Sequence, residues 1–383
     1  MGNDEMTEYY IRLGYALGAG NIRAKRALEY FGNAENIFKA SDKERAESGI
    51  FTKNELLRIK NSQNAAALET LEECKENGID IICYGDKNYP YCLSVIDDAP
   101  ALLYVKGTMP DFDNIPAVCI VGPRKVTEKG KMASYSIARR LALSGMTVVS
   151  GGALGCDSAA HSGALKADGI TALVMGCGIL SDYLQENAGL RESVSRSGCL
   201  ISEYPPHYGA SRYTFPVRNR IMSALSVCTV VIEAGVKSGA LITARHAAEQ
   251  GKDVFVIPGD VEKAEFKGSN ALLRDGAKPL IDMSDIFNEY IPRFPDKIDV
   301  KRAYSAQTGA ADKKEKEPVH KNLSNETLSK NAKIVYNHLD KHKFYPEEIK
   351  DTGLGAGEIL SALTELEVEL LIRSLPGGCY EML

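Results

Sequence analysis

Residues 116–178 contain three apolar runs that each end in glycine: PAVCIVG (116–122), MTVVSGG (146–152) and ITALVMGCG (170–178). Segments with helical patterning, KGKMASYSIARRLALSG and DSAAHSGALKADG, lie between them. Continuously apolar strands are typical of a sheet that is buried on both faces, and alternation with helices is typical of parallel pairing. The pattern continues through CLISEY (199–204), VCTVVIEAG (227–235) and DVFVIPG (253–259). Residues 115–285 therefore predict an α/β fold with a doubly wound parallel sheet.

The composition narrows the class of protein. The chain has 383 residues, of which 44% are hydrophobic and 25% charged, and its net charge is −5. It contains no run of about 18 apolar residues, and its N-terminal segment MGNDEMTEYY is acidic, so we expect neither a membrane span nor a signal peptide. The nine cysteines show no CxxC spacing, and several lie in apolar runs. This usage is typical of buried thiols in a reducing compartment, so we expect a cytoplasmic protein without a metal site.

The predicted strands end in polar, glycine-rich segments. The first ends in Gly122-Pro123-Arg124, the second continues into SGGALG (150–155), and the fifth leads to Lys237-Ser238-Gly239. In an open parallel sheet, ligands bind outside the carboxyl ends of the strands, where helix N-termini present backbone N–H groups to anions. SGGALG is not GxGxxG, no acidic residue ends the second strand, and no Walker motif occurs. We therefore expect no dinucleotide cofactor and no nucleotide hydrolysis.

Basic residues are concentrated locally although the net charge is negative. Residues 120–140 hold six Lys and Arg residues against Glu128 alone, and the segment PVRNRIMSALS (216–226) places Arg218, Asn219 and Arg220 at a predicted helix start. Arginine opposes the helix dipole there, so a second role is expected. Paired guanidinium groups fit a phosphate chain. The alternative is that they form ion pairs with Glu203 or Glu233.

Several motifs in a fixed order resemble those of the DNA-processing protein A (DprA/Smf) family. They are VGPRKVTEKG, SGGALGCDSAAHSGAL, FPVRNRIMSALS, VVIEAGVKSGALITARHAAEQGKDVFVIPG and KGSNALLRDGA, and the similarity extends over about residues 85–281. The resemblance implies a Rossmann-like domain that binds single-stranded DNA, forms a homodimer and loads the RecA recombinase in natural transformation. It also implies that the protein is not an enzyme.

The family's DNA-binding residues can be carried over position by position. The matching residues are Gly122 and Arg124 in the first turn; Ser150, Gly151, Gly152, Ala153 and Gly155 in the glycine loop; Arg218, Asn219 and Arg220; and Lys237, Ser238, Gly239 and Thr243. The chain departs from the pattern at Pro123, which replaces Ser, at Leu154, which stands where Arg is usual, and at Tyr183-Leu184 in place of Tyr-Pro. These departures affect the expected affinity more than the expected class of ligand.

Four regions are predicted along the chain. Residues 1–78 are expected to form a helical domain similar to SAM or helix-hairpin-helix units, with a plain helical bundle as the alternative. Residues 79–290 are expected to form the extended Rossmann-like DNA-binding domain. Residues 291–325 are rich in charge and are expected to be a flexible linker. Residues 326–383 are predicted to form a winged-helix domain. Its candidate recognition helix, residues 355–371, carries four glutamates and no basic residue. Because carboxylates repel phosphates, we expect this domain to bind protein or to regulate.

Two other functions compete with DNA binding. Nucleoside monophosphate phosphoribohydrolases resemble the same Rossmann subgroup, and Glu203 or Glu233 could act as the catalytic carboxylate of such an enzyme. Their motif Pro-Gly-Gly-x-Gly-Thr-x-x-Glu is absent from this chain. A structural adaptor that binds protein alone is the remaining hypothesis, and a gel shift with single-stranded oligonucleotides distinguishes it.

Overall fold

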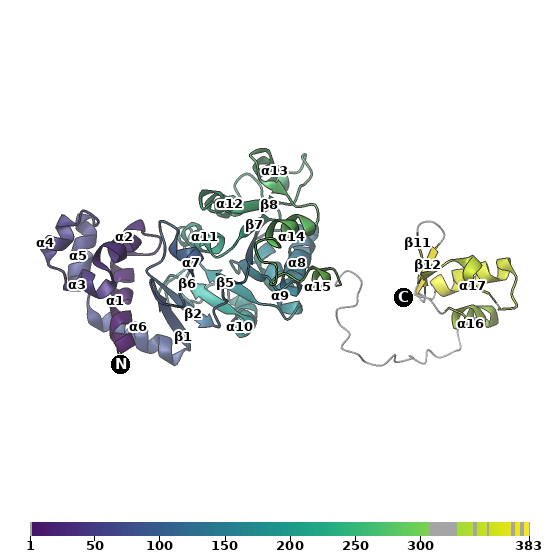
Figure 1. The fold of residues 1–383 in the computed structure, drawn as a ribbon, viewed down its shortest axis with the longest axis horizontal. Coiled ribbons are helices and arrows are strands. Elements are labelled where there is room, and N and C mark those ends of the chain that lie inside the picture. Colours follow the sequence, from purple (N-terminus) through teal and green to yellow (C-terminus); the bar gives the residue numbers. More distant parts are fainter. Residues whose placement is uncertain are drawn as a thin grey trace. The chain divides into compact units, whose positions relative to one another are not determined.

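The computed structural model of the chain contains two compact units, Met1–Asp312 and Lys313–Leu383 (Figure 1). It describes residues 2–305, 328–339, 343–350, 352–368, 372–375 and 379–382. None of the helices in these ranges is long and apolar enough to cross a membrane.

The N-terminal part of the first unit is helical, as predicted. Side-chain caps define where several helices begin; Thr52 and Glu55, for example, form a reciprocal capping box at one of them. The assignment to the SAM or helix-hairpin-helix class stays a prediction. The helices are α1 (Gly2–Leu17), α2 (Ile22–Phe31), α3 (Ala34–Lys39), α4 (Asp42–Glu47), α5 (Lys53–Asn61) and α6 (Asn64–Glu76).

A nine-stranded sheet forms the centre of this unit, in the order β1-β2-β6-β5-β4-β3-β7-β8-β9. The strands from β6 to β9 in this order are parallel, whereas β1 and β2 add an antiparallel edge through β2–β6 pairing. The doubly wound parallel sheet is thus confirmed. The strands are β1 (Ile79–Cys83), β2 (Leu102–Gly107), β3 (Ala117–Val121), β4 (Thr147–Ser150), β5 (Thr171–Met175), β6 (Cys199–Ser202), β7 (Cys228–Val231), β8 (Asp253–Val256) and β9 (Lys278–Pro279).

Helices cover both faces of the sheet, which explains why its strands are continuously apolar (Figure 1). On β3, Val118 and Ile120 face α8 and α9, whereas Cys119 and Val121 face α11 and α12. The N-terminal helices share a hydrophobic core with β2, β5 and β6. The remaining helices of the unit are α7 (Tyr91–Ser94), α8 (Glu128–Leu143), α9 (Cys156–Lys166), η1 (Gln185–Asn187), α10 (Ala188–Ser197), α11 (Thr214–Ala224), α12 (Ala240–Glu249), η2 (Ala264–Phe266), α13 (Lys267–Arg274), α14 (Ser284–Tyr290) and α15 (Val300–Ser305).

The strand order places a topological switch point at β3. Its neighbours are β4 on one side and β7 on the other, so successive connections leave in opposite directions. Such a switch opens a crevice outside the carboxyl ends of the strands. The loops after β3, β4 and β7 meet there, and they carry most of the residues that the sequence selects.

The segment after Tyr290 differs from the predicted linker. Ile298 and Ala303 are buried in the core beside α8, and the Asp299 N–H donates to the Ser144 carbonyl at 2.8 Å. Residues 291–305 are therefore structured, because apolar side chains recur among their charges and reach this core. The rest of the predicted linker, 306–325, lies outside the described residues.

The second unit contains a three-stranded sheet in the order β10-β12-β11. Its core includes Val335, Leu363, Leu366 and Ile372. The two-residue strand β10 was not predicted from the sequence, and the winged-helix assignment stays a prediction. The elements are α16 (Lys330–Asn337), β10 (Lys343–Phe344), η4 (Pro346–Glu348), α17 (Ala356–Val368), β11 (Ile372–Leu375) and β12 (Cys379–Met382).

Candidate nucleic-acid interface

An open pocket of about 370 Å³ lies at the switch point. It brings together the loops after β3, β4 and β7, one face of α11 and the first turns of α9 and α12. Eight of the fourteen residues predicted for DNA binding line it: Gly122, Arg124, Ala153, Arg218, Asn219, Ser238, Gly239 and Thr243. Segments that are more than a hundred residues apart in the sequence thus form one surface.

Arg124 is the exposed cation of this pocket. It follows β3, and its guanidinium lies 5.1 Å from the centroid of the Phe215 ring. Phe215 is in the first turn of α11 and is partly exposed, and the Tyr183 ring lies 5.3 Å from it. An arginine over an aromatic face offers a phosphate donor and a stacking surface side by side.

Phe215 is a pocket residue that the sequence analysis did not select, although it lies in the quoted segment FPVRNR. Aromatic side chains usually indicate a core, so the residue type alone carried no signal. Its position three residues before Arg218 on a helix start is the clue, because that spacing puts both side chains on one face.

Arg218 lies under the pocket rather than at its rim. It is 5% exposed, and its Nη1 donates to the carbonyls of Gly151, at 2.8 Å, and Val174. Its guanidinium also lies 6.0 Å from the Phe215 centroid. Its Nε donates to Asn219 Oδ1 at 3.2 Å, so the side chain is held by three hydrogen bonds, and its main local effect is to hold the glycine loop and to add positive charge.

Asp157 balances this charge and was not predicted. Its buried carboxylate, in the first turn of α9, accepts the Ala153 N–H at 3.3 Å and lines the pocket. Burial raises the pKa of Asp157 and lowers that of Arg218, and the mutual attraction of the two groups opposes both shifts. Two buried groups of opposite charge therefore lie beneath the exposed Arg124.

The glycines make close backbone approach possible. A Cβ at Gly151 would lie 2.4 Å from Arg218 Nη1, and one at Gly122 would lie 2.6 Å from the Cys156 sulfur. Gly155 has φ +83°, where a Cβ would meet the Arg124 carbonyl oxygen at 2.3 Å. Gly155 has to be glycine because its Cβ would meet backbone, whereas a Cβ at Gly151 would displace the Arg218 guanidinium.

The other predicted residues lie outside the pocket lining. The Ser150 hydroxyl is buried and donates to the Ile120 carbonyl at 2.7 Å, and Gly152 packs against Leu173. Lys237 is exposed on the loop after β7, one residue before the pocket residue Ser238. These residues border the pocket without forming its walls.

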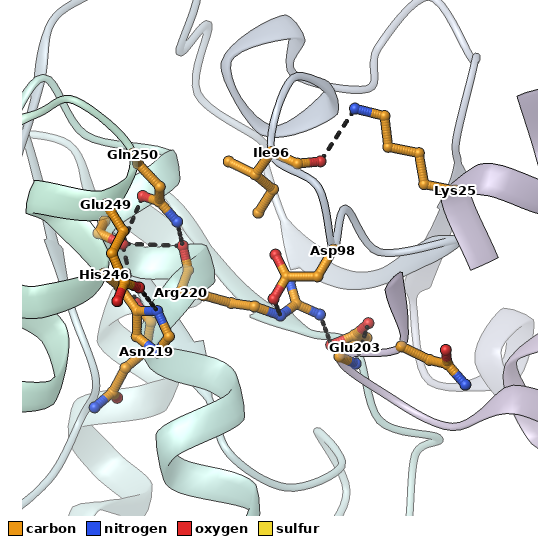
Figure 2. A network of polar contacts seen from close by, with 12 residues as sticks. Lys25, Ile96, Asp98, Glu203, Asn219, Arg220, His246, Glu249 and Gln250 are labelled. Carbon is orange, nitrogen blue, oxygen red and sulfur yellow. Dashed lines mark hydrogen bonds and ion pairs between the residues drawn. The ribbon is translucent and has the colours of Figure 1, made fainter. Parts of the chain in front are cut away.

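Arg220 is directed away from the pocket, toward the N-terminal helices (Figure 2). It is 1% exposed and forms ion pairs with Glu203 at 2.6 Å and Asp98 at 3.3 Å. The Glu203 carboxylate also accepts the Gly20 N–H at 3.1 Å. The ion pair considered in the sequence analysis is thus present for Arg220, and it joins the sheet to the α1–α2 loop.

Glu203 and Glu233, the two carboxylates considered for catalysis, do not line the pocket. Glu233 follows β7, and its buried carboxylate reaches the start of α8. There it accepts hydrogen bonds from the backbone N–H of Thr127, at 3.1 Å, and from the Thr127 hydroxyl. The carboxylate therefore fills the position that an anion would take at this helix N-terminus.

The model of the family described as DNA recombination-mediator protein A matches residues 80–291. The chain belongs to this family. Members of the DprA/Smf group are similar over longer ranges: Protein Smf from Synechocystis sp. is 31% identical over 402 residues, covering 100% of both chains. The predicted family is confirmed, and with it a role in DNA recombination at the level of the family.

Two solved structures of the family resemble the fold. DNA processing protein A from Streptococcus pneumoniae has a TM-score of 0.66 and 31% identity, covering 74% of this chain and 98% of the other. The protein from Helicobacter pylori, described for its unique single-stranded DNA binding mode, has a TM-score of 0.50 and 30% identity. This match covers 54% of the present chain and 95% of the Helicobacter pylori chain.

Proposed function

We propose that this recombination mediator binds single-stranded DNA at the switch-point pocket. The observation that carries the proposal is the placement of Arg124 over Phe215 at the carboxyl ends of the parallel strands. Arg124 would contact phosphate, and Phe215 would stack on a base. Because phosphate contacts and stacking carry little base identity, binding would be nearly independent of sequence.

The distribution of charge supports this ligand. The chain is acidic overall, yet its pocket has Arg124 at the surface and Lys237 on the adjacent loop. The buried Arg218 is balanced by Asp157, so the exposed cations determine the potential that a strand meets. The related Helicobacter pylori protein, described as binding single-stranded DNA, shares this fold at 30% identity.

The test is fluorescence anisotropy with an oligo-dT strand over a range of salt concentrations. Arg124→Ala should weaken binding and reduce the slope of log K against log salt by about 0.7, the value for one phosphate contact on a single strand. Phe215→Ala should cost about 1–3 kcal/mol with an unchanged slope, because stacking releases no counterions.

Arg196→Ala is the matched control, because Arg196 is exposed on α10 and pairs with Glu192 outside the pocket. It should bind like the wild type. If Arg124→Ala and Phe215→Ala both fold and bind with wild-type affinity, the site is wrong.

We further propose that two copies associate through the Rossmann-like part, protect incoming DNA during transformation and load a RecA recombinase. Membership of the mediator family supports this, as does the similarity to the Streptococcus pneumoniae protein. Two pockets on one strand would raise the affinity by avidity. Light scattering at micromolar concentration that finds monomers with and without DNA would contradict the dimer, and strand-exchange assays with RecA test the loading step.

The nucleotide-processing alternative receives less support. Glu203 is paired with Arg220, and Glu233 caps α8, so neither is placed to act on a ligand in the pocket. We propose a binding protein without catalytic activity. Release of free base from nucleoside monophosphates is the assay that would overturn this.

A further inference from the structure

A second cavity lies between the N-terminal helices and the edge of the sheet. Its volume is about 250 Å³, and its lining comes from α1, the α1–α2 loop, β2 and the loop after β6. It shares no lining residue with the switch-point pocket. Pockets for drug-sized ligands have volumes of about 300–1,000 Å³, so this cavity suits a single ring system.

The walls of the cavity are apolar and aromatic. Leu13 and Leu102 contribute aliphatic surface. Tyr204 and Tyr208 stack with centroids 5.0 Å apart and an angle of 25° between their planes, and Tyr208 is half exposed. A flat heteroaromatic ring extends such a stack favourably.

The Tyr104 hydroxyl is an unused polar group at the cavity. The Tyr104 side chain is 2% exposed and lines the cavity. Its hydroxyl forms no hydrogen bond with any residue that the structure describes. The hydroxyl oxygen itself keeps some exposed surface. The hydroxyl is therefore accessible from the cavity, where a ligand can supply its hydrogen-bond partner.

The Glu203 carboxylate is the acceptor of the site. It lines the cavity, and Arg220 and the Gly20 N–H hold it in place at 2.6 and 3.1 Å (Figure 2). A carboxylate has about four lone-pair positions, so two remain for a ligand. Adjacent N–H donors on one ring edge, as in the N1–H and N2 amino group of guanine, match two carboxylate oxygens.

Arg58 supplies an exposed cation to the lining of the cavity. It has no ion-pair or hydrogen-bond partner among the described residues. A phosphate outside the cavity would meet this guanidinium while the base stays inside.

From these contacts we infer that the cavity binds a guanine base, with the phosphate of its nucleotide at Arg58. The donors of the base would meet Glu203, its ring would stack beside the tyrosines, and the Tyr104 hydroxyl would bond to a ring nitrogen or the carbonyl. The site is separate from the switch-point pocket, and the inference stands without the proposed function. A free nucleotide and a base of a bound strand would present the same chemistry.

The test is calorimetric titration of the full chain with guanosine monophosphate and with adenosine monophosphate. Saturable binding of the guanine nucleotide, at least about tenfold tighter than the adenine nucleotide, is expected, because adenine lacks the paired donors. The Arg124→Ala variant should bind the nucleotide unchanged, since Arg124 lies in the other pocket. Loss of nucleotide binding in this variant would place the ligand in the switch-point pocket and overturn the inference.

Two substitutions test the cavity itself. Tyr104→Phe removes one hydroxyl and should weaken binding severalfold, and Ala19→Phe, on the half-buried α1–α2 loop, should block the cavity without altering the core. Tyr30→Phe, a 65% exposed tyrosine outside the lining, is the matched control. No saturable binding at millimolar concentration, equal binding of both nucleotides, or binding unaffected by Ala19→Phe would refute the site.

A DNA titration distinguishes the two sources of the base. An oligo-dT strand with one internal dG should bind like plain oligo-dT if the ligand is a free nucleotide. A preference for the dG strand that Ala19→Phe abolishes would identify the bound strand as the source and would support the same site.

Discussion

Replacing Arg220 with methionine should destabilise the Met1–Asp312 unit without removing a phosphate contact. The Arg220 side chain is 2% exposed and pairs with Glu203, whose side chain is 9% exposed, and with Asp98, whose side chain is 34% exposed. Removing one partner of a buried ion pair typically costs about 3–5 kcal/mol, because the other charge stays buried. The partly exposed Asp98 contributes less, so we expect about 3 kcal/mol at pH 8.

The pH dependence gives this prediction a sign. Burial raises the pKa of Glu203 above its ordinary value of 4.5, and the Arg220 charge is the largest influence that lowers it. Without Arg220 the pKa rises further. A carboxyl whose folded-state pKa exceeds its unfolded value stabilises the fold when protonated, and that contribution is lost as the pH rises through the folded-state pKa. The destabilisation of Arg220→Met should therefore shrink as the pH falls from 8 toward 5.

The assay is urea denaturation of the full chain followed by circular dichroism, at pH 8 and at pH 5. In a second variant, Glu203→Gln is added to Arg220→Met, which removes the uncompensated charge and should recover about half of the lost stability at pH 8. The salt slope for oligo-dT should equal that of the wild type at a pH where the variant is folded. A loss below about 1 kcal/mol, no rescue by Glu203→Gln, or a slope reduced like that of Arg124→Ala would refute the reasoning.

Three further results are expected. Asp157→Asn should tighten binding to oligo-dT by about 1 kcal/mol, roughly fivefold, because it leaves the charge of Arg218 uncompensated under the pocket; unchanged affinity in an anisotropy titration would contradict this. Gly151→Ala should weaken DNA binding, since the added Cβ would lie 2.4 Å from the present position of Arg218 Nη1 and would displace the guanidinium. A crystal structure of the variant with an unmoved Arg218 would contradict this explanation. Truncation after Ser305 should leave the affinity within about threefold, under ~0.7 kcal/mol, whereas a tenfold loss would mean that the C-terminal unit contacts DNA. The truncation follows Ser305 because Ile298 belongs to the core beside α8 and has to be retained.

The alternation of apolar runs and helical segments determined the class of the fold from sequence. PAVCIVG is apolar at every position of β3, and VCTVVIEAG at every position of β7 except the buried Thr229, because helices cover both faces of the sheet. The glycine loop and Arg124 were likewise found from sequence, since strand ends in a parallel sheet converge at one edge. Two strands of two residues each, Lys278–Pro279 and Lys343–Phe344, were too short to produce a pattern.

The direction of each arginine in Arg218-Asn219-Arg220 was decided by the tertiary structure alone. Residues two positions apart on a helix point to different sides, so Arg218 reaches the glycine loop while Arg220 reaches Glu203. The partners come from strands and loops distant in sequence, and no local pattern specifies them. For the same reason Phe215 became a pocket residue and Asp157 a buried counter-charge only once the chain had folded. Local periodicity records which residues are buried, whereas the packing of separate segments determines which of them meet.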